Sequence, residues 1–248
     1  MINIRKPGMS NLGDSMNVPL VEYITGEQPN AIKRTDEIYK VEVIYLVIGS
    51  CLQLSHKNTI VWGAGYISEN SKVVEVPKAI YAVRGPKTCR RLHEQGITCP
   101  EVFGDPALLY PRYYKPKVQK KYKLGIVPHY VDKCLAKEYE DVLIVDVQGS
   151  VNKVVNQILS CKYIASSSLH GLIVADAYGI PSTWIEYSKR VVGRGFKFWD
   201  YFSSVGRKLE SPLQIDARTT IKDIMDRFYE YDIEIDLDKL YNACPFKK

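Results

Sequence analysis

The chain has 248 residues and a formal net charge of +6; 46% of its residues are hydrophobic and 25% are charged. This composition excludes a disordered polypeptide and supplies enough apolar surface for one large or two small packed domains. No apolar run approaches the roughly 20 residues of a membrane helix and no signal-peptide core opens the sequence, so we expect a cytoplasmic protein. The six scattered cysteines lack metal-ligand spacing, which predicts reduced thiols and no metal.

A candidate ligand loop lies near the start of the chain. Residues 1–14 are rich in turn formers and short on apolar periodicity, and they include Asn11, Gly13 and Asp14. These three residues predict a loop that leads into a helix, with Asp14 as the cap and Gly13 letting the backbone approach a ligand. A capping turn that binds nothing is the alternative.

Two β-branched runs follow and predict buried parallel strands. They cover residues 41–48 and 59–62, and each ends in a glycine turn. Gly63 and Gly65, in the second turn, are therefore candidates for the wall of a cleft. The turn lacks the third glycine of a dinucleotide fingerprint and no acidic residue follows at the required spacing, which argues against a nicotinamide cofactor.

The next predicted strand, residues 79–83, delivers Arg84 at its carboxyl end. Pro86 suits the first turn of a helix that runs through Leu92, because the missing N–H costs nothing there. Arg84 is then expected on the rim of the cleft, where its guanidinium can hold a phosphate or carboxylate bidentately. A surface salt bridge is the alternative. Asp105 is predicted to cap a short helix at Ala107.

A linker divides the chain into two halves. Residues 110–121 contain two prolines and five basic residues. We predict an N-terminal domain (1–112), a C-terminal domain (121–231) and a tail (232–248) free to return to the first domain. The second half resumes the alternation of strands (123–127, 142–147) and helices (131–138, 152–161), and His129 follows its first strand. The pattern predicts an α/β protein with two Rossmann-like domains facing a central cleft.

The most informative stretch is residues 163–186. A short apolar strand breaks into three serines, and His170 then stands in the first turn of a helix that is stopped by Gly179 and followed by a strand at residues 182–186. Ligands bind at the carboxyl ends of parallel strands, where the unpaired N–H groups of a helix start face the cleft. The candidate binding residues around His170 are Ser167, Ser168, Leu169 and Gly171.

Cations alternate with aromatic residues between 187 and 207. The cations are Lys189, Arg190, Arg194 and Lys197, and the first three are candidate site residues. The segment suits a cleft wall that binds anionic sugars, or an amphipathic edge that touches the inner face of the cell membrane. A buried aromatic helix with a solvated basic face is the third alternative. The net positive charge favours anionic partners, whereas the absence of RNA-binding motifs argues against nucleic acid.

Several motifs, in this order, resemble those of the polysaccharide pyruvyl transferases. They are NLGD at 11–14, the strand and glycine turn at 60–65, YAVRGPKT at 81–88, GDPALL at 104–109 and SSSLHGLIVADAYGIP at 166–181. The resemblance covers nearly the whole chain. It implies a fold similar to that of the B-type glycosyltransferases and transfer of pyruvate from phosphoenolpyruvate to a sugar of a polysaccharide or its lipid-diphosphate-linked precursor, in exopolysaccharide or capsule biosynthesis. No cofactor is implied beyond phosphoenolpyruvate as co-substrate.

The family motif has a histidine that matches His170 and an arginine that matches Arg84. Many members have arginine where this chain has Ser168, and Lys189, Arg190 or Arg194 are expected to replace that charge. Ketal formation needs one acid/base and several fixed cations. His170 is the expected acid, and because a helix start disfavours a protonated imidazole, we expect the bound donor to supply a compensating anion.

Two other functions use the same architecture. A nucleotide-sugar-dependent glycosyltransferase would hold a diphosphate with the same basic residues. A non-catalytic module for anionic glycans would keep His170 as a packed core residue. Fold alone does not choose among the three.

Overall fold

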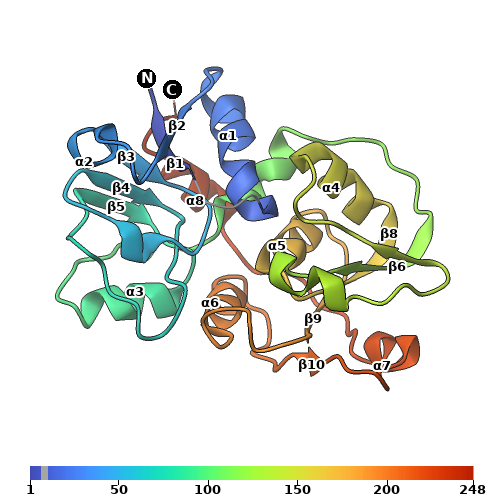
Figure 1. Ribbon diagram of the computed structural model, residues 1–248. Helices are drawn as coiled ribbons and strands as arrows, with labels where there is room; N and C mark the ends of the chain where they lie inside the picture. The colour runs from blue at the N-terminus through green and yellow to red at the C-terminus, as the bar shows by residue number, and fades with distance from the viewer. Residues whose placement is uncertain (7–10, 248) are drawn as a thin grey trace.

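Two parallel five-stranded sheets stand side by side in the structure, a computed structural model (Figure 1). The structure describes residues 1–6 and 11–247, so residues 7–10 of the predicted N-terminal loop and Lys248 of the tail lie outside the described residues. The strand orders are β2-β1-β3-β4-β5 and β10-β9-β8-β6-β7. Parallel sheets alternating with helices confirm the predicted α/β class and are consistent with two Rossmann-like domains.

The first half contains one sheet and its connections. Its strands are β1 (Asn3–Lys6), β2 (Asn30–Lys33), β3 (Ile44–Leu46), β4 (Thr59–Trp62) and β5 (Ala79–Ala82). Its helices are α1 (Leu12–Thr25), α2 (Ile38–Val41) and α3 (Pro86–His93), with 3-10 turns η1 (Leu52–Leu54) and η2 (Pro106–Arg112).

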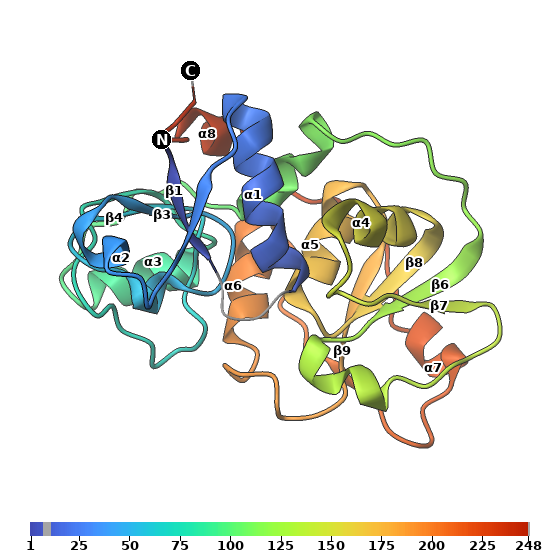
Figure 2. The same ribbon diagram turned by 45° about the horizontal axis from the view of Figure 1, so that its top comes forward.

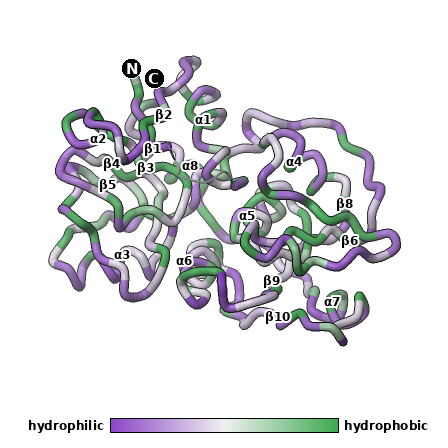
Figure 3. Tube along the Cα trace, viewed as in Figure 1, coloured by the Kyte–Doolittle hydropathy of each residue, from purple (hydrophilic) through white to green (hydrophobic). Residues whose placement is uncertain are grey.

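The second half repeats this plan. Its strands are β6 (Tyr122–Val127), β7 (Val142–Ile144), β8 (Cys161–Ser166), β9 (Ser182–Glu186) and β10 (Leu213–Gln214). Its helices are α4 (Val151–Leu159), α5 (Leu169–Ala177), α6 (Phe196–Ser204), α7 (Ile221–Met225) and α8 (Leu237–Asn242), with the 3-10 turn η3 (Tyr130–Leu135). In Figure 3 the backbone is coloured hydrophobic along β6 and β8, while hydrophilic stretches lie in the connecting loops.

Some predicted elements differ in length or type. The predicted strand at 41–48 pairs only at Ile44–Leu46, because the side chain of Asn17 binds both the N–H and the C=O of Ile48 (2.8 and 3.0 Å) in place of a neighbouring strand. The predicted helix at 131–138 is the 3-10 turn η3. Three strands were not predicted: β1, β2 and the two-residue β10. β1 and β2 have four residues each, and β1 buries one large apolar side chain, Ile4.

Helix α6 packs across the boundary between the two halves. Its Asp200 accepts hydrogen bonds from the N–H (2.8 Å) and hydroxyl (2.7 Å) of Thr88 on α3. On its other side, Phe198 stacks on Trp184 of β9 with ring centroids 4.3 Å apart. The aromatic side chains of α6 at positions 196, 198, 201 and 202 are buried. The aromatic side chains of α6 therefore belong to the core and do not form an exposed amphipathic edge.

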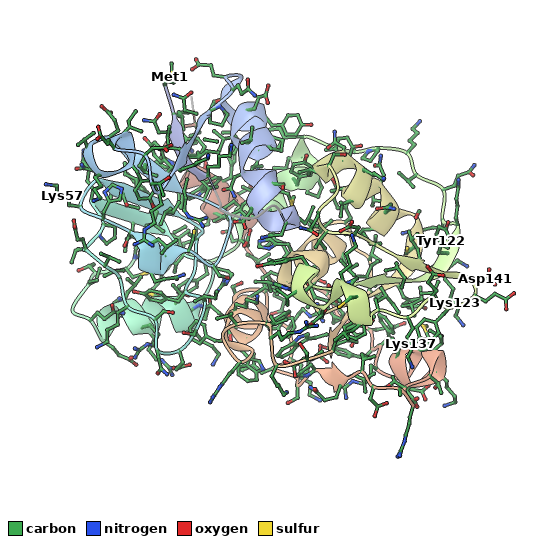
Figure 4. The ribbon with its side chains drawn as sticks, viewed as in Figure 1. Met1, Lys57, Tyr122, Lys123, Lys137 and Asp141 are labelled. Carbon is green, nitrogen blue, oxygen red and sulfur yellow. The ribbon has the colours of Figure 1, made fainter. Side chains whose placement is uncertain are left out.

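The end of the chain lies against the first half, as both ribbon views show (Figures 1 and 2). The indole N–H of Trp62 on β4 donates to the C=O of Leu240 on α8 at 3.0 Å, and Phe246 meets the Trp62 ring edge-on. Within the described part of the chain, none of the helices is long and apolar enough to cross a membrane. The side chains labelled in Figure 4, among them Lys57, Lys137 and Asp141, mark the outer flanks of the two halves.

Candidate active site between the two sheets

A cavity of about 250 Å³ lies at the carboxyl ends of strands from both sheets. The first half contributes residues after β1 and β3, and the second half contributes residues after β6 and at the start of α5. The lining residues are Arg5, Asn11, Asp14, Gly49, Ser50, Cys51, Gln53, Leu54, Ile67, His129, Tyr130, Ser168, Leu169, His170 and Lys197. This is the position at which open parallel sheets bind ligands.

The predicted ligand loop forms the first turn of α1. Asn11, not Asp14, is the cap: its side-chain oxygen accepts from the N–H of Asp14 at 3.2 Å. The Asp14 carboxylate accepts a hydrogen bond from the side-chain amide of Asn11 at 2.5 Å and lines the cavity, where it lies 3.7 Å from the guanidinium of Arg5. Burial raises the pKa of Asp14, and the charges of Arg5 and His170 oppose that rise.

His170 lies between a carboxylate and a glycine. Its Nε2 is 3.4 Å from Oδ2 of Asp105, which is fully buried and uses Oδ1 to accept from the N–H of Ala107 at 3.0 Å. The predicted cap at Asp105 is thus confirmed, and its second oxygen faces the histidine. The sequence predicts that a bound donor supplies the anion for a protonated His170; the structure places a carboxylate of the chain itself, that of Asp105, beside the ring.

Gly13 makes room for this histidine. A Cβ at position 13 would lie 2.1 Å from both Cε1 and Nδ1 of the His170 ring. Real atoms do not approach so closely, so the ring can occupy its place only because α1 has a glycine there. The predicted contact of Gly13 is with a ligand, whereas the structure shows a contact with His170.

Gly13→Ala is expected to destabilise the protein by about 1–3 kcal/mol, as overpacking does in a tight interior. The sign is informative, because alanine normally stabilises a helix relative to glycine. Chemical denaturation of the parent and of Gly13→Ala measures the change in the free energy of unfolding. The control is the same substitution in a His170→Ala background, where the clash is absent and the helix should gain stability; an equal loss in both backgrounds would contradict this contact.

The three serines before α5 have different uses. The Ser166 hydroxyl accepts from the N–H of Ser168 at 3.0 Å, and the Ser167 hydroxyl accepts from the N–H of His129 at 2.8 Å, which ties β8 to β6. Ser168 precedes α5, but its side chain makes no capping bond and lines the cavity. Of the three hydroxyls, that of Ser168 is therefore the one available to a ligand.

Two cations line the cavity, and neither was among the predicted site residues. Arg5 reaches the cavity because it stands near the carboxyl end of β1, the second strand of its sheet. Lys197 stands on the first turn of α6 and is only 7% exposed. Burial and the nearby charge of Arg84 lower the pKa of Lys197 to about 8, and Asp14 opposes this shift.

Lys197→Met is expected to stabilise the ligand-free protein by about 3 kcal/mol near pH 7, since each unit of pKa shift corresponds to about 1.4 kcal/mol. The pKa of Lys197 in the folded protein lies below the ordinary lysine value of 10.5. The penalty of the charged lysine is therefore complete below about pH 8 and fades as the pH rises toward 10.5.

Denaturation of the parent and of Lys197→Met between pH 7 and pH 10 measures this difference, which should shrink across the range. Besides Arg84 and Asp14, His129 carries a titratable group near Lys197. Lys208→Met removes an exposed lysine and should leave stability unchanged. A Lys197→Met variant that is less stable than the parent at pH 7 would contradict the expectation.

Arg84 does not lie on the rim of the cleft. Its side chain is fully buried, and its Nε contacts Asp200 at 2.9 Å. Its two terminal nitrogens donate to the hydroxyl of Ser50 and to the C=O of Tyr66, both at 2.6 Å. The guanidinium thus lies one side chain behind the cavity wall. Gly65 is also an internal contact, because a Cβ there would lie 2.6 Å from the Arg84 guanidinium carbon.

The other predicted cations are outside the cavity. Lys189 is exposed and paired with Glu186, and Arg190 pairs with the buried carboxylate of Asp132 at 3.0 Å. Arg194 is exposed with a positive φ of 46° and, with Lys189, borders a separate hollow beside β9. These contacts place the three cations away from His170.

Some of the remaining predicted residues line the cavity, and others pack against neighbouring side chains. His129 lines the cavity, and burial together with the charges of Lys197 and His170 lowers its pKa to about 3, so its ring is neutral. Gly63 packs against Pro106, Gly171 packs against Ser166, and neither lines the cavity. Burial raises the pKa of the Cys51 thiol in the cavity to about 11, so it is not a thiolate.

Sequence reasoning missed Arg5, Lys197 and the contact of Asp105 with His170. Arg5 lies in a segment that was interpreted as turn-rich, and the single buried side chain of β1 gave no strand pattern. Lys197 belongs to the predicted basic aromatic segment, but a helical pattern does not reveal which of several cations is buried. In the part of the chain that the structure describes, no cluster of histidine, cysteine or acidic side chains could hold a metal ion.

Comparisons with known proteins identify a matching family model and several similar proteins. A family model described as polysaccharide pyruvyl transferase matches residues 23–189. The uncharacterised protein L143 of Acanthamoeba polyphaga mimivirus is 32% identical over 211 residues, which cover 79% of this chain and 71% of that protein. The succinoglycan biosynthesis protein ExoV of Rhizobium meliloti is 25% identical over 242 residues, covering 90% and 71%. A functionally uncharacterised Klebsiella pneumoniae protein of solved structure aligns with a TM-score of 0.48 and 13% identity, covering 81% and 86%.

Proposed function

Because the chain belongs to the polysaccharide pyruvyl transferase family, we propose that it transfers pyruvate from phosphoenolpyruvate to a sugar and leaves a cyclic ketal. The acceptor is a sugar of a polysaccharide or of its lipid-diphosphate-linked precursor. The observation that carries the proposal is the His170–Asp105 pair at a cavity that also contains Arg5 and Lys197. An acid/base beside fixed cations is what the chemistry of this donor requires.

The reaction balances without a cofactor. A proton adds to the methylene carbon of phosphoenolpyruvate, and one sugar hydroxyl attacks the cationic C2 and loses its proton. The bond from C2 to the phosphate oxygen then breaks, and a second hydroxyl attacks C2, loses its proton and closes the ring. Of the two hydroxyl protons, one balances the proton gained by the methylene carbon and the other leaves with inorganic phosphate.

His170 delivers the proton in this scheme. Its Nε2 is buried and faces Asp105, and its Nδ1 lies beside Gly13 at the start of α1. The Asp105 carboxylate stabilises the protonated ring at a helix start, where the helix dipole would otherwise oppose the charge. Asp105 acts through the histidine and is a positioning residue.

The acceptor approaches from the side of α1. Asn11 and Asp14 line the cavity there, and an amide next to a carboxylate suits the hydroxyl groups of a sugar. The Ser168 hydroxyl and the free N–H groups of the first turn of α5 add uncharged donors for the phosphate or carboxylate of the donor. In this proposal the two halves take the arrangement of the B-type glycosyltransferases, with donor and acceptor meeting between them.

Acceptor-dependent release of phosphate tests the proposal. The purified protein is incubated with phosphoenolpyruvate and a panel of galactose-, glucose- and mannose-type acceptors, and inorganic phosphate is measured. Release with one acceptor class, accompanied by a mass gain of 70 on the sugar as expected for a pyruvate ketal, would support it. If no acceptor elicits release while a nucleotide-sugar raises the melting temperature, the glycosyltransferase alternative replaces it.

A further inference from the structure

The cavity contains a buried cation, Lys197, that has no partner of opposite charge in the described part of the chain. Among the described residues, the ammonium of Lys197 has no hydrogen-bond acceptor and no carboxylate within 4.0 Å, although it is only 7% exposed. The ammonium lies over the ring of Phe198, 5.6 Å from the ring centroid. An isolated buried charge is costly, and proteins normally pair it. An ammonium that faces a cavity in this state is expected to receive an anion.

The surrounding charges favour the same conclusion. Arg84 and Asp200 form a buried pair that adds no net charge, while Arg5 and Lys197 both line the cavity. Asp14 is the carboxylate among the lining residues, and it lies 3.7 Å from Arg5. The lining therefore has one cation more than it has carboxylates, with His129 neutral.

The three cations predicted from the sequence do not fill this role. Lys189 and Arg190 already have carboxylate partners, and Arg194 is exposed at another hollow. A donor that reaches His170 therefore meets Lys197 rather than any of these side chains.

We propose that Lys197, together with Arg5, binds an oxyanion of the donor, either its phosphate or its carboxylate. The identity of the donor rests on the proposed function, whereas the anion site does not. Lys197 is then destabilising in the empty protein, and the bound anionic substrate offsets this cost. A lysine with a purely structural role would not behave in this way.

Isothermal titration of the parent, Lys197→Met and Lys208→Met with phosphoenolpyruvate, inorganic phosphate and oxalate tests the assignment. We expect Lys197→Met to weaken phosphoenolpyruvate binding about 10- to 100-fold, the range for a hydrogen bond to a charged group. Lys208→Met, which loses an exposed charge outside the cavity, should bind like the parent. Weaker phosphate binding assigns Lys197 to the donor's phosphate, and weaker oxalate binding assigns it to the carboxylate.

The outcomes separate this inference from the proposed function. Unchanged affinity of Lys197→Met for all three anions would overturn the role of Lys197 and leave pyruvyl transfer standing. Phosphate binding that depends on Lys197, without any binding of phosphoenolpyruvate, would support the anion site and remove the donor. A parent that binds none of the three overturns both. Lys197→Gln serves as a second variant if the methionine variant does not fold.

Discussion

Replacing His170 by glutamine is expected to reduce acceptor-dependent phosphate release about 10³-fold, in the middle of the range for loss of a general acid. Glutamine keeps a polar side chain of similar reach beside Asp105 but cannot transfer a proton. Because the ring of His170 fills the space left by Gly13, the smaller glutamine should be accommodated with little change in melting temperature. Phosphate release and thermal unfolding are measured on the same preparation.

The matched control is His93→Gln, which changes an exposed histidine on α3 outside the cavity. It should release phosphate at the rate of the parent. If His170→Gln retained more than about a tenth of the parent activity while remaining folded, His170 would be a packed core histidine and another group would supply the proton. His129 would then be a poor substitute, because its pKa is lowered to about 3.

The part of the site around His170 could be predicted because it is local in sequence. A buried strand followed by three serines and an amphipathic run defines a strand end and a helix start within a few residues. His170, Ser168 and Leu169 do line the cavity, and Asn11 and Asp14 line it from α1. In each case the polar residue adjoins the element that positions it.

The placement of the charges could not be predicted in the same way. Whether a cation is paired depends on partners that are remote in sequence: Arg84 finds Asp200, 116 residues further on. The same sequence pattern that put Arg84 at a strand end gave no sign that α6 would cover it. Conversely, Lys197 is one cation among several between residues 187 and 207, and only the packing of α6 against both halves buries it.

The two sheets show a similar division. The β-branched run at 59–62 identified β4, and the alternation of strands and helices in the second half identified β6; most residues of both strands are buried. β1 pairs with both β2 and β3, yet it has four residues, of which two are cationic. Its place in the sheet comes from pairing on both sides rather than from its own side chains. The residues around Arg5 in the sequence therefore do not predict that it lines the cavity.

Arg84→Met is expected to lower the free energy of unfolding by about 3–5 kcal/mol, because it leaves the buried carboxylate of Asp200 without its cation. Both side chains are fully buried, and Arg84 also loses its hydrogen bonds to Ser50 and Tyr66. The pair joins the first half of the chain to α6, so the loss should appear as a lower denaturation midpoint of the whole protein rather than as a local change.

Arg194→Met is the matched control, since Arg194 is exposed, and surface substitutions usually change stability by less than about 0.5 kcal/mol. The double variant Arg84→Met/Asp200→Asn should recover part of the loss, because removing the charge from position 200 relieves the unpaired carboxylate. If Arg84→Met kept the parent's denaturation midpoint but bound phosphoenolpyruvate more weakly, Arg84 would contact the donor as its sequence position first indicated. A loss of stability that the double variant partly reverses would instead assign Arg84 to the boundary between the two halves, where it supports Ser50 at the cavity wall.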